Sequence, residues 1–247
     1  MRGIRELTLT QFKLFLREPF AAFFTLVFPT MLILLFGAIY GNDPLPMFGG
    51  YGSMDISMPN YTGLILGSVG LLSVPIATGG YRELGVLRRL RATPMRPLTY
   101  IVADVITNLV MVILGMILLV IVGWAIYKVR FEGQILSVFA GVVLGGLSLF
   151  ALGYLIASLA PSARAAQVIS MIIFYPMMFL SGAGMPIEIM PETVQRISDF
   201  LPLTYVIRLL RGLWFGDPWG EHWPEVAVLT GVLVLSAALS ARFFRWE

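Results

Sequence analysis

The sequence predicts an all-α, polytopic membrane protein with six transmembrane helices in one domain, residues 1–247. Of the 247 residues, 58% are hydrophobic and only 13% are charged, whereas a soluble domain carries about 25% charged residues. Six apolar stretches also reach the length of about 20 residues that a helix needs to cross the hydrocarbon core. These unbroken runs favour helices, because a membrane barrel shows alternating strands of about ten residues.

The six predicted spans are separated by polar segments of unequal length. The first span follows eighteen mostly polar or amphipathic residues. It is too long for a cleavable signal peptide, so we expect it to remain in the mature protein. The predicted spans are residues 20–40, 61–81, 101–127, 135–159, 165–183 and 226–244.

Basic residues are distributed unevenly between the two sides that these spans create. The side with both termini holds twelve basic and four acidic residues, and the other side holds five basic and nine acidic residues. Loops rich in lysine and arginine stay in the cytoplasm. We therefore expect a multi-pass protein of the inner (plasma) membrane with both termini cytoplasmic.

The composition excludes several kinds of site. The chain has no cysteine and one histidine, His222, which excludes multi-histidine metal sites and cysteine nucleophiles. Its two lysines, Lys13 and Lys128, follow Phe12 and Tyr127. The Gly-Lys-Ser/Thr phosphate loop of ATPases therefore cannot be written anywhere in the chain. We expect no catalytic residue, no metal and no cofactor in this chain.

Residues 1–18 have the pattern of an amphipathic helix, with a charged sector opposite an apolar side. Such a helix lies along the membrane surface. We interpret it as a cytoplasmic anchor for the first span rather than as a contact to a transported molecule. The charged sector holds Arg2, Glu6, Lys13 and Arg17, and the apolar side holds Ile4, Leu7, Phe12 and Phe15.

The loop at residues 82–96 is short, dense in arginine and compatible with a helix. A topology signal that needs only positive charge accounts for its arginines, but not for Glu83, Gly85 or the Thr93-Pro94 stop. Glu83 falls on the apolar side, where an unpaired carboxylate is costly. A loop this short is a poor reader of nucleic-acid grooves, so we expect no nucleic-acid partner. On a helical wheel the basic face holds Arg82, Gly85, Arg88 and Arg89, and the apolar face holds Val86, Leu87 and Leu90.

Asp104 is an acidic residue within about two turns of the start of span three, and Asn108 lies one turn further on the same face. An ionisable residue inside a span is a functional candidate. Its closeness to the cytoplasm favours a simpler role, in which it reaches water or pairs with a loop arginine. A proton relay needs further acids deeper in the membrane, and the remaining spans offer none.

Span five carries a cluster of aromatic residues and methionines around its middle. Such residues form a surface that adapts to varied apolar ligands, so we expect them to line a substrate pathway, although ordinary helix packing gives the same composition. Spans two and four carry small residues at a spacing that allows close helix contact. The cluster is Phe174, Tyr175, Met177, Met178 and Phe179, and the small residues are Gly63, Gly67, Gly141 and Gly145.

Residues 185–223, between spans five and six, form a long external segment. It is too polar to cross the membrane and too apolar to be disordered. We predict two short helices, one starting near Pro191 and one after Pro202, because proline is favoured in the first turn of a helix. These helices either cap an external exit or serve only as a packed lid.

Three features, spread over nearly the whole chain, carry a family resemblance. The opening Leu-Thr-Gln-Phe-Lys-Leu-Phe-Leu-Arg-Glu-Pro19 leads directly into an apolar span. Arg-Glu-x-Gly-x-Leu through Ala-Thr-Pro94 lies between spans two and three. Met-Pro186 through Leu-Pro-Leu-Thr204 to Arg-Gly212 precedes span six. Together they resemble the ABC-2 type transporter permeases, the membrane subunits of a class of ATP-binding cassette exporters, and in particular their drug-resistance and sodium-export branch.

The resemblance implies that residues 82–96 form a coupling helix docked in a groove of a separate ATPase subunit, which would bind ATP and Mg. It also implies a second permease subunit, either another copy or a related chain. Spans two and five would face a central pathway for a hydrophobic or amphipathic substrate, and Gly85 would allow close approach of the ATPase. Asp104 departs from the basic residue often seen near this point. The coupling residues would be Arg82, Glu83, Gly85, Leu87, Arg88, Arg89, Arg91, Thr93 and Pro94.

Two other classes of function compete with this interpretation. An ion- or proton-coupled secondary transporter needs buried carboxylates or broken helices near the midplane, and only Asp104 and the prolines of spans two and five support it. An intramembrane enzyme needs clustered acid, histidine or serine residues inside the spans, and the sequence lacks such clusters.

Overall fold

The computed structural model describes residues 12–13, 22–86 and 97–243, with side chains described from Tyr100 in the last range. Within these residues every regular element is helical, and the only β pairing is an isolated bridge between Pro44 and Gly52. The six predicted spans are confirmed at Phe23–Tyr40, Ser53–Glu83, Tyr100–Tyr127, Ile135–Leu159, Ala163–Leu180 and Trp219–Phe243.

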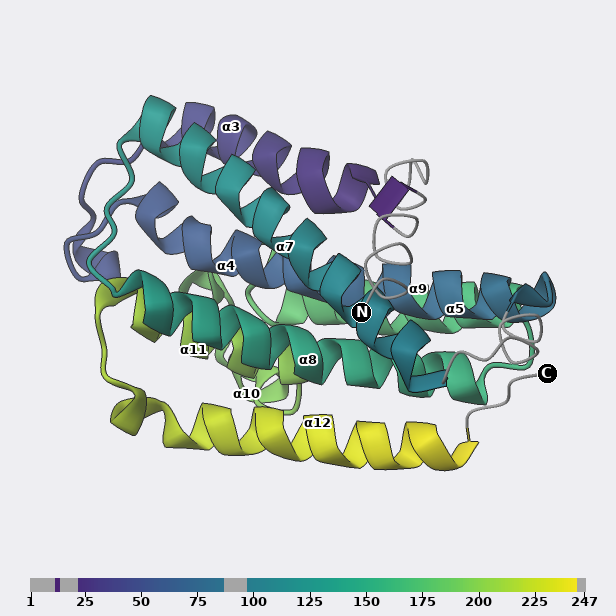
Figure 1. Cartoon of the computed structure of the whole chain (residues 1–247). Helices are drawn as coiled ribbons and strands as arrows, with labels where there is room; N and C mark the ends of the chain where they lie inside the picture. The colour runs from purple at the N-terminus through teal and green to yellow at the C-terminus, as the bar shows by residue number, and fades with distance from the viewer. Residues whose placement is uncertain (1–11, 14–21, 87–96, 244–247) are drawn as a thin grey trace.

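The spans form an elongated bundle whose connections gather at two ends (Figure 1). The Asp55 end is the one at which α4 and α8 begin and α3 and α7 end. The Glu83 end is the one at which α5 and α8 end and α9 begins. The helices are α3 (Phe28–Tyr40), α4 (Ser53–Ser68), α5 (Val74–Glu83), α7 (Pro97–Tyr127), α8 (Ile135–Leu159), α9 (Ala163–Leu180), α10 (Glu192–Ser198), α11 (Pro202–Phe215) and α12 (Trp223–Phe243).

Span two begins at Ser53, within the stretch that the sequence assigned to an external loop. The helix starts there because Asp55 accepts a hydrogen bond from the N–H of Gly52, at 3.0 Å from Oδ2. This is one half of a capping box, in which an acidic side chain three residues into the helix binds back to the N–H of its N-cap. Gly52 has no side chain to supply the other half. Pro59 lies inside α4. Hydropathy did not predict the start of this helix, because its first residues are polar.

The middle of span two is a wide π turn, Val69–Ser73, two residues before Pro75. Proline removes one helical hydrogen bond and crowds the carbonyl four residues earlier, and a local π turn accommodates that crowding. At this turn span two lies against α8. A Cβ on Gly153 would lie 2.0 Å from the carbonyl oxygen of Gly70, so the two backbones can approach this closely only with glycine at Gly153.

Span two is also the most enclosed helix of the subunit. In its most apolar window 78% of the residues are buried, and α4 packs against α3, α7, α8, α9 and α11. All residues from 54 to 72 are buried. Other helices of the same chain therefore cover most of span two, and the expectation that it faces a pathway stays a prediction.

The two short helices predicted between spans five and six are confirmed as α10 and α11, but α11 is more than a surface cap. A Cβ on Gly63 would lie 2.6 Å from Ile207 Cγ1, and one on Gly67 would lie 3.3 Å from Leu203 Cδ2. Gly67 is about 21 Å from the start of α4 at 1.5 Å per residue. Helix α11 therefore begins at mid-span depth and is a re-entrant helix. The glycines of span four that also contact it are Gly141 and Gly145.

The predicted amphipathic helix at residues 1–18 lies outside the described residues, apart from Phe12 and Lys13. Both of these residues are helical. Phe12 is half-buried and packs against the hydrophobic core.

Candidate functional site

Arg82, in the last turn of α5, binds the end of span four. Its Nη1 donates to the carbonyl oxygen of Ala157 at 3.1 Å, and its Nη2 donates to the carbonyl oxygen of Ala160. These carbonyls belong to the last turn and C-cap of α8, where helical carbonyls lack partners. A cation at a helix C-terminus also interacts favourably with the helix dipole, by about 0.3–1 kcal/mol.

Glu83, the next residue, binds the beginning of span five. Its Oε1 accepts a hydrogen bond from the N–H of Ala163 at 2.7 Å, and an anion at a helix N-terminus is favoured by the dipole. Ser162 caps the same helix by accepting from the N–H of Ala165 at 3.0 Å. The partner expected for Glu83 is therefore the first turn of α9. Arg82 and Glu83 together hold the turn between α8 and α9, and we call this pair the Arg82–Glu83 clamp.

The chain changes direction directly after the clamp. Gly85 has φ +65°, in the left-handed region, and its N–H donates to the carbonyl oxygen of Arg82 at 3.0 Å. A left-handed glycine just after a helix is a common helix stop. Arg82 thus belongs to the helix of span two, which ends before Gly85. Arg88, which the helical wheel placed on the same face, lies outside the described residues.

Gly85 was expected to allow close approach of the ATPase subunit, and that role stays a prediction. No described atom lies within 4 Å of the place where its Cβ would be, so its backbone conformation is what requires glycine. The remaining coupling residues lie outside the described residues, and their role stays a prediction. They are Leu87, Arg88, Arg89, Arg91, Thr93 and Pro94.

Asp104 is buried, with 8% of its surface exposed, rather than open to water. Its Oδ2 accepts a hydrogen bond from Asn108 Nδ2 at 3.1 Å and another from the hydroxyl of Tyr154. The expectation that Asn108 shares its face is confirmed. Because Tyr154 is in α8, Asp104 links span three to span four near the Glu83 end.

The five aromatic and methionine residues of span five do not share one face. Phe174, Met177 and Met178 are buried inside the subunit, whereas Phe179 is 60% exposed and Tyr175 is half-buried. A helix places residues three or four apart on one face, so five neighbouring residues point to several sides. In the single subunit only Tyr175 and Phe179 reach the surface, and the role of the set as a pathway lining stays a prediction.

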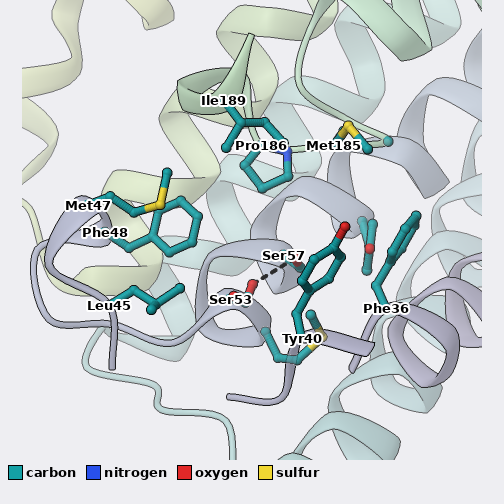
Figure 2. A pocket seen from close by; sticks show the side chains of 13 residues that line it. Phe36, Tyr40, Leu45, Met47, Phe48, Ser53, Ser57, Met185, Pro186 and Ile189 are labelled. Carbon is teal, nitrogen blue, oxygen red and sulfur yellow. Dashed lines mark hydrogen bonds between the residues drawn. The ribbon is translucent and has the colours of Figure 1, made fainter. Parts of the chain in front are cut away.

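A cavity of about 180 Å³ opens beyond the end of α9, toward the Asp55 end (Figure 2). Apolar side chains from α3, the following loop and the segment after α9 surround it. Three hydroxyl-bearing residues of α4, together with Tyr40 of α3, supply its polar lining, and Ser57 donates to the carbonyl oxygen of Ser53 at 2.8 Å. The lining residues that Figure 2 shows most plainly are Phe36, Tyr40, Phe48, Met185, Pro186 and Ile189.

A buried polar network holds the Asp55 end, and the sequence analysis missed it. Asp55 is fully buried and accepts hydrogen bonds from Asn42 Nδ2 at 3.0 Å and from the N–H of Arg130 at 2.9 Å. Asn42 Nδ2 also donates to the carbonyl oxygen of Tyr127 at 3.1 Å. The capping signal Gly52-Ser-Met-Asp55 ahead of an apolar run was the sequence feature that marks this site.

These features define a polytopic integral membrane protein in which a basic segment between the second and third spans adjoins a clamp on spans four and five. Among the described residues no group of three or more His, Asp or Glu side chains is placed to hold a metal ion. The chain belongs to the ABC-2 type transporter family, which matches residues 2–215.

Curated relatives are similar over part of their length. Nodulation protein J of Rhizobium leguminosarum bv. viciae is 32% identical over 104 residues, which is 42% of this chain and 40% of that protein. The probable multidrug ABC transporter permease YbhR of Escherichia coli K12 is 24% identical over 60% of this chain and 41% of that protein. The inner membrane transport permease YhhJ of the same strain is 26% identical over 61% and 41%. The matches therefore span about two fifths of each relative's length.

Proposed function

We propose that this chain is the permease subunit of an ABC exporter of hydrophobic or amphipathic molecules, in the inner (plasma) membrane with both termini cytoplasmic. It acts with a second permease subunit, a copy of itself or a related chain. A separate ATPase subunit binds ATP and Mg and drives it. Family membership supports the class of protein. The name of the multidrug relative and the apolar cavity support the kind of substrate.

The Arg82–Glu83 clamp is the observation that carries this proposal. The arginine-dense loop 82–96 begins at the clamp, so a movement of that loop is passed directly to the turn between α8 and α9. Because α9 starts at this turn, span five receives the movement at its first residue. The loop docks on the ATPase, and the clamp converts that docking into a displacement of span five.

The substrate pathway follows from the same geometry. Toward the cavity of Figure 2 the exposed face of α9 is apolar, whereas its first two turns, next to the clamp, expose Arg164 and Gln167. Tyr175 lies beside this face. A displacement of α9 therefore changes the walls of a route between the Glu83 end and the cavity. The exposed residues of this face are Val168, Ile172 and Phe179.

Reversing the charge at Glu83 tests the proposal. In Glu83→Lys a cation faces the N-terminus of α9, where the helix dipole opposes it, so substrate-stimulated ATPase activity of the assembled transporter should fall at least tenfold while membrane insertion is retained. The matched control is Glu192→Lys, which changes an exposed acid of α10 whose ion pair among the described residues is with Arg196, at 3.5 Å.

Co-purification with the ATPase and stimulated hydrolysis are measured for both variants. Full stimulation in the assembled Glu83→Lys complex would contradict the proposal, and so would an equal loss in the Glu192→Lys control.

A further inference from the structure

A groove of about 430 Å³ lies between α7 and α8, close to the Asp55 end. Its volume is within the range of about 300–1,000 Å³ that ligand sites occupy. Figure 1 shows the two helices diverging toward the loop 128–134 that joins them. Apolar side chains make up nearly the whole lining, and several of them are exposed on the outside of the bundle. The exposed ones are Ile117, Ile121, Trp124, Phe131, Ile135 and Phe139.

Both walls of this groove are membrane spans. What surrounds it is therefore hydrocarbon rather than water, and the available ligand is an acyl chain of the bilayer. A second copy of the chain would have to fill the groove with a helix, which is about 10–12 Å wide with its side chains. A single flexible chain follows a groove of about 430 Å³ between two diverging helices better than a helix does.

The loop at the open end of the groove supplies a cation. Among the described residues, four of the five basic side chains predicted on this side are ion-paired with acids, whereas Lys128 has no acidic partner. Lys128 is exposed and directly precedes Val129, which lines the groove. The four paired residues are Arg130, Arg196, Arg208 and Arg211.

Lys128 and Trp124 are placed as interfacial residues of membrane proteins are. The N–H of Lys128 donates to the carbonyl oxygen of Trp124 at 3.2 Å, so the two residues lie one helical turn apart. Trp124 is 69% exposed and lines the groove. Tryptophan is enriched at the level of lipid headgroups, and lysine is attracted to anionic headgroups there.

The backbone at Lys128 offers a second, independent observation. Its φ is 51°, which makes it the only residue other than glycine with a positive φ in the described part of the chain. The position just past a helix end in this conformation is usually occupied by glycine or asparagine. A lysine here costs backbone energy, which a functional need for its charge explains.

We infer that the α7–α8 groove binds one acyl chain of an anionic phospholipid, with the phosphate of the headgroup at Lys128. The apolar walls select a hydrocarbon chain, and the unpaired ammonium selects a negative headgroup. The inference depends on the membrane-spanning fold and is independent of the proposed transport function.

Fluorescence quenching by brominated lipids tests this site in the full-length protein reconstituted in phosphatidylcholine bilayers. Trp124 and Trp223 are matched reporters, because each is 69% exposed. Subtracting the emission of Trp124→Phe or Trp223→Phe from that of the parent isolates each signal. At Trp124, the affinity for brominated phosphatidylglycerol, measured from the quenching, should be about fivefold higher than that for brominated phosphatidylcholine. This is the factor that one lysine near an anionic surface gives. Trp223 lies between Glu221 and Glu225 and should show no such preference.

Two variants separate the headgroup contact from the groove. Lys128→Gly should remove the preference at Trp124 while leaving the protein at least as stable, because glycine suits the backbone there. Val120→Phe, which fills the groove, should reduce quenching of Trp124 by both lipids.

Equal quenching by the two lipids in the parent, or an unchanged preference in Lys128→Gly, would overturn the inference. A Phe139→Cys variant tests a second copy as the occupant, because the natural chain has no cysteine. Rapid formation of a disulfide-linked dimer of this variant in the bilayer would show that protein covers the groove, and would also overturn it.

Discussion

The two ends of the helical bundle are held by different kinds of polar contact. At the Asp55 end a fully buried carboxylate joins the loop after α3, the start of α4 and the loop after α7. At the Glu83 end the Arg82–Glu83 clamp joins α5 to the turn between α8 and α9 through partly exposed side chains.

This difference determines which end can move. Removing one partner from a buried charged group costs about 3–5 kcal/mol, because the other partner stays buried without compensation. A contact between an exposed charge and a helix terminus contributes about 0.3–1 kcal/mol, so it breaks and reforms readily. The Asp55 end is therefore fixed, whereas at the Glu83 end only the turn between α8 and α9 is adjustable, because the buried Asp104 joins spans three and four there. An adjustable turn suits a subunit driven from the Glu83 end.

Replacing the buried carboxylate should have the largest effect. Asp55→Ala leaves the side-chain amide of Asn42 and the N–H of Arg130 without their acceptor, so the protein should lose about 3–5 kcal/mol of stability. Thermal unfolding in detergent measures this loss. The control is Asp43→Ala, an exposed acid in the same loop, which should change stability by less than about 0.5 kcal/mol. Similar losses in the two variants would remove the distinction between the ends.

The sequence was sufficient to locate the spans, because a bilayer demands a long apolar run and such runs are local in sequence. It was also sufficient for α10 and α11, whose starts are marked by Pro191 and Pro202. The depth of α11 could not be predicted. Glycines that face a helix from the same subunit look the same in sequence as glycines that face another subunit.

The candidate site was predicted only where its contacts are local. Glu83 stood out as an acid among arginines, but its partner Ala163 is 80 residues away. Asp55 was passed over because its partners Asn42 and Arg130 are 13 and 75 residues away. Neither pairing leaves a pattern along one chain, whereas the Asp104–Asn108 contact, one turn apart, was visible on a helical wheel.

Releasing one side of the clamp should have a smaller effect on stability and a larger one on coupling. Arg82→Ala removes two charge-assisted hydrogen bonds to the end of α8, and the partial exposure of the side chain limits the loss to about 1–2 kcal/mol. Substrate-stimulated ATPase activity in the assembled transporter should fall by a larger factor than stability alone explains. Arg164→Ala is the control, since it removes an exposed cation from the first turn of α9. If both variants retain normal stimulation, the clamp has no part in coupling.

Replacing Lys128 by glycine should relieve backbone strain in the loop at the Asp55 end. Lys128→Gly keeps the left-handed turn that ends α7 without the steric cost of a side chain, which is about 1 kcal/mol. The melting temperature in neutral detergent should therefore rise slightly. Lys128→Ala keeps that cost and removes the same charge, so it is the matched control. A lower melting temperature for glycine than for alanine would mean that the lysine stem, rather than the backbone, stabilises this turn.

The smallest effect concerns a surface contact at the Asp55 end that depends on pH. The hydroxyl of Tyr51 donates to Glu132 Oε2 at 2.9 Å, and this hydrogen bond raises the pKa of Tyr51 above its usual value of 10.0. Folding thus favours the neutral phenol. The stabilisation is fully present below about pH 10, the pKa of tyrosine in an unfolded chain, and is lost as the pH rises through the higher pKa of the folded protein.

Tyr51→Phe should therefore lower stability by about 0.5 kcal/mol at neutral pH, and the difference from the parent protein should disappear at alkaline pH. The ring contact with Phe215, at 4.2 Å between centroids, remains in the variant, so the change isolates the hydroxyl. Tyr40→Phe, at a tyrosine 61% exposed, serves as the control for removing a phenolic hydroxyl at neutral pH. If the stability difference between the parent and Tyr51→Phe instead increased as the pH rises, the hydroxyl would be stabilised as the phenolate. The contact to Glu132 would then not stabilise this end.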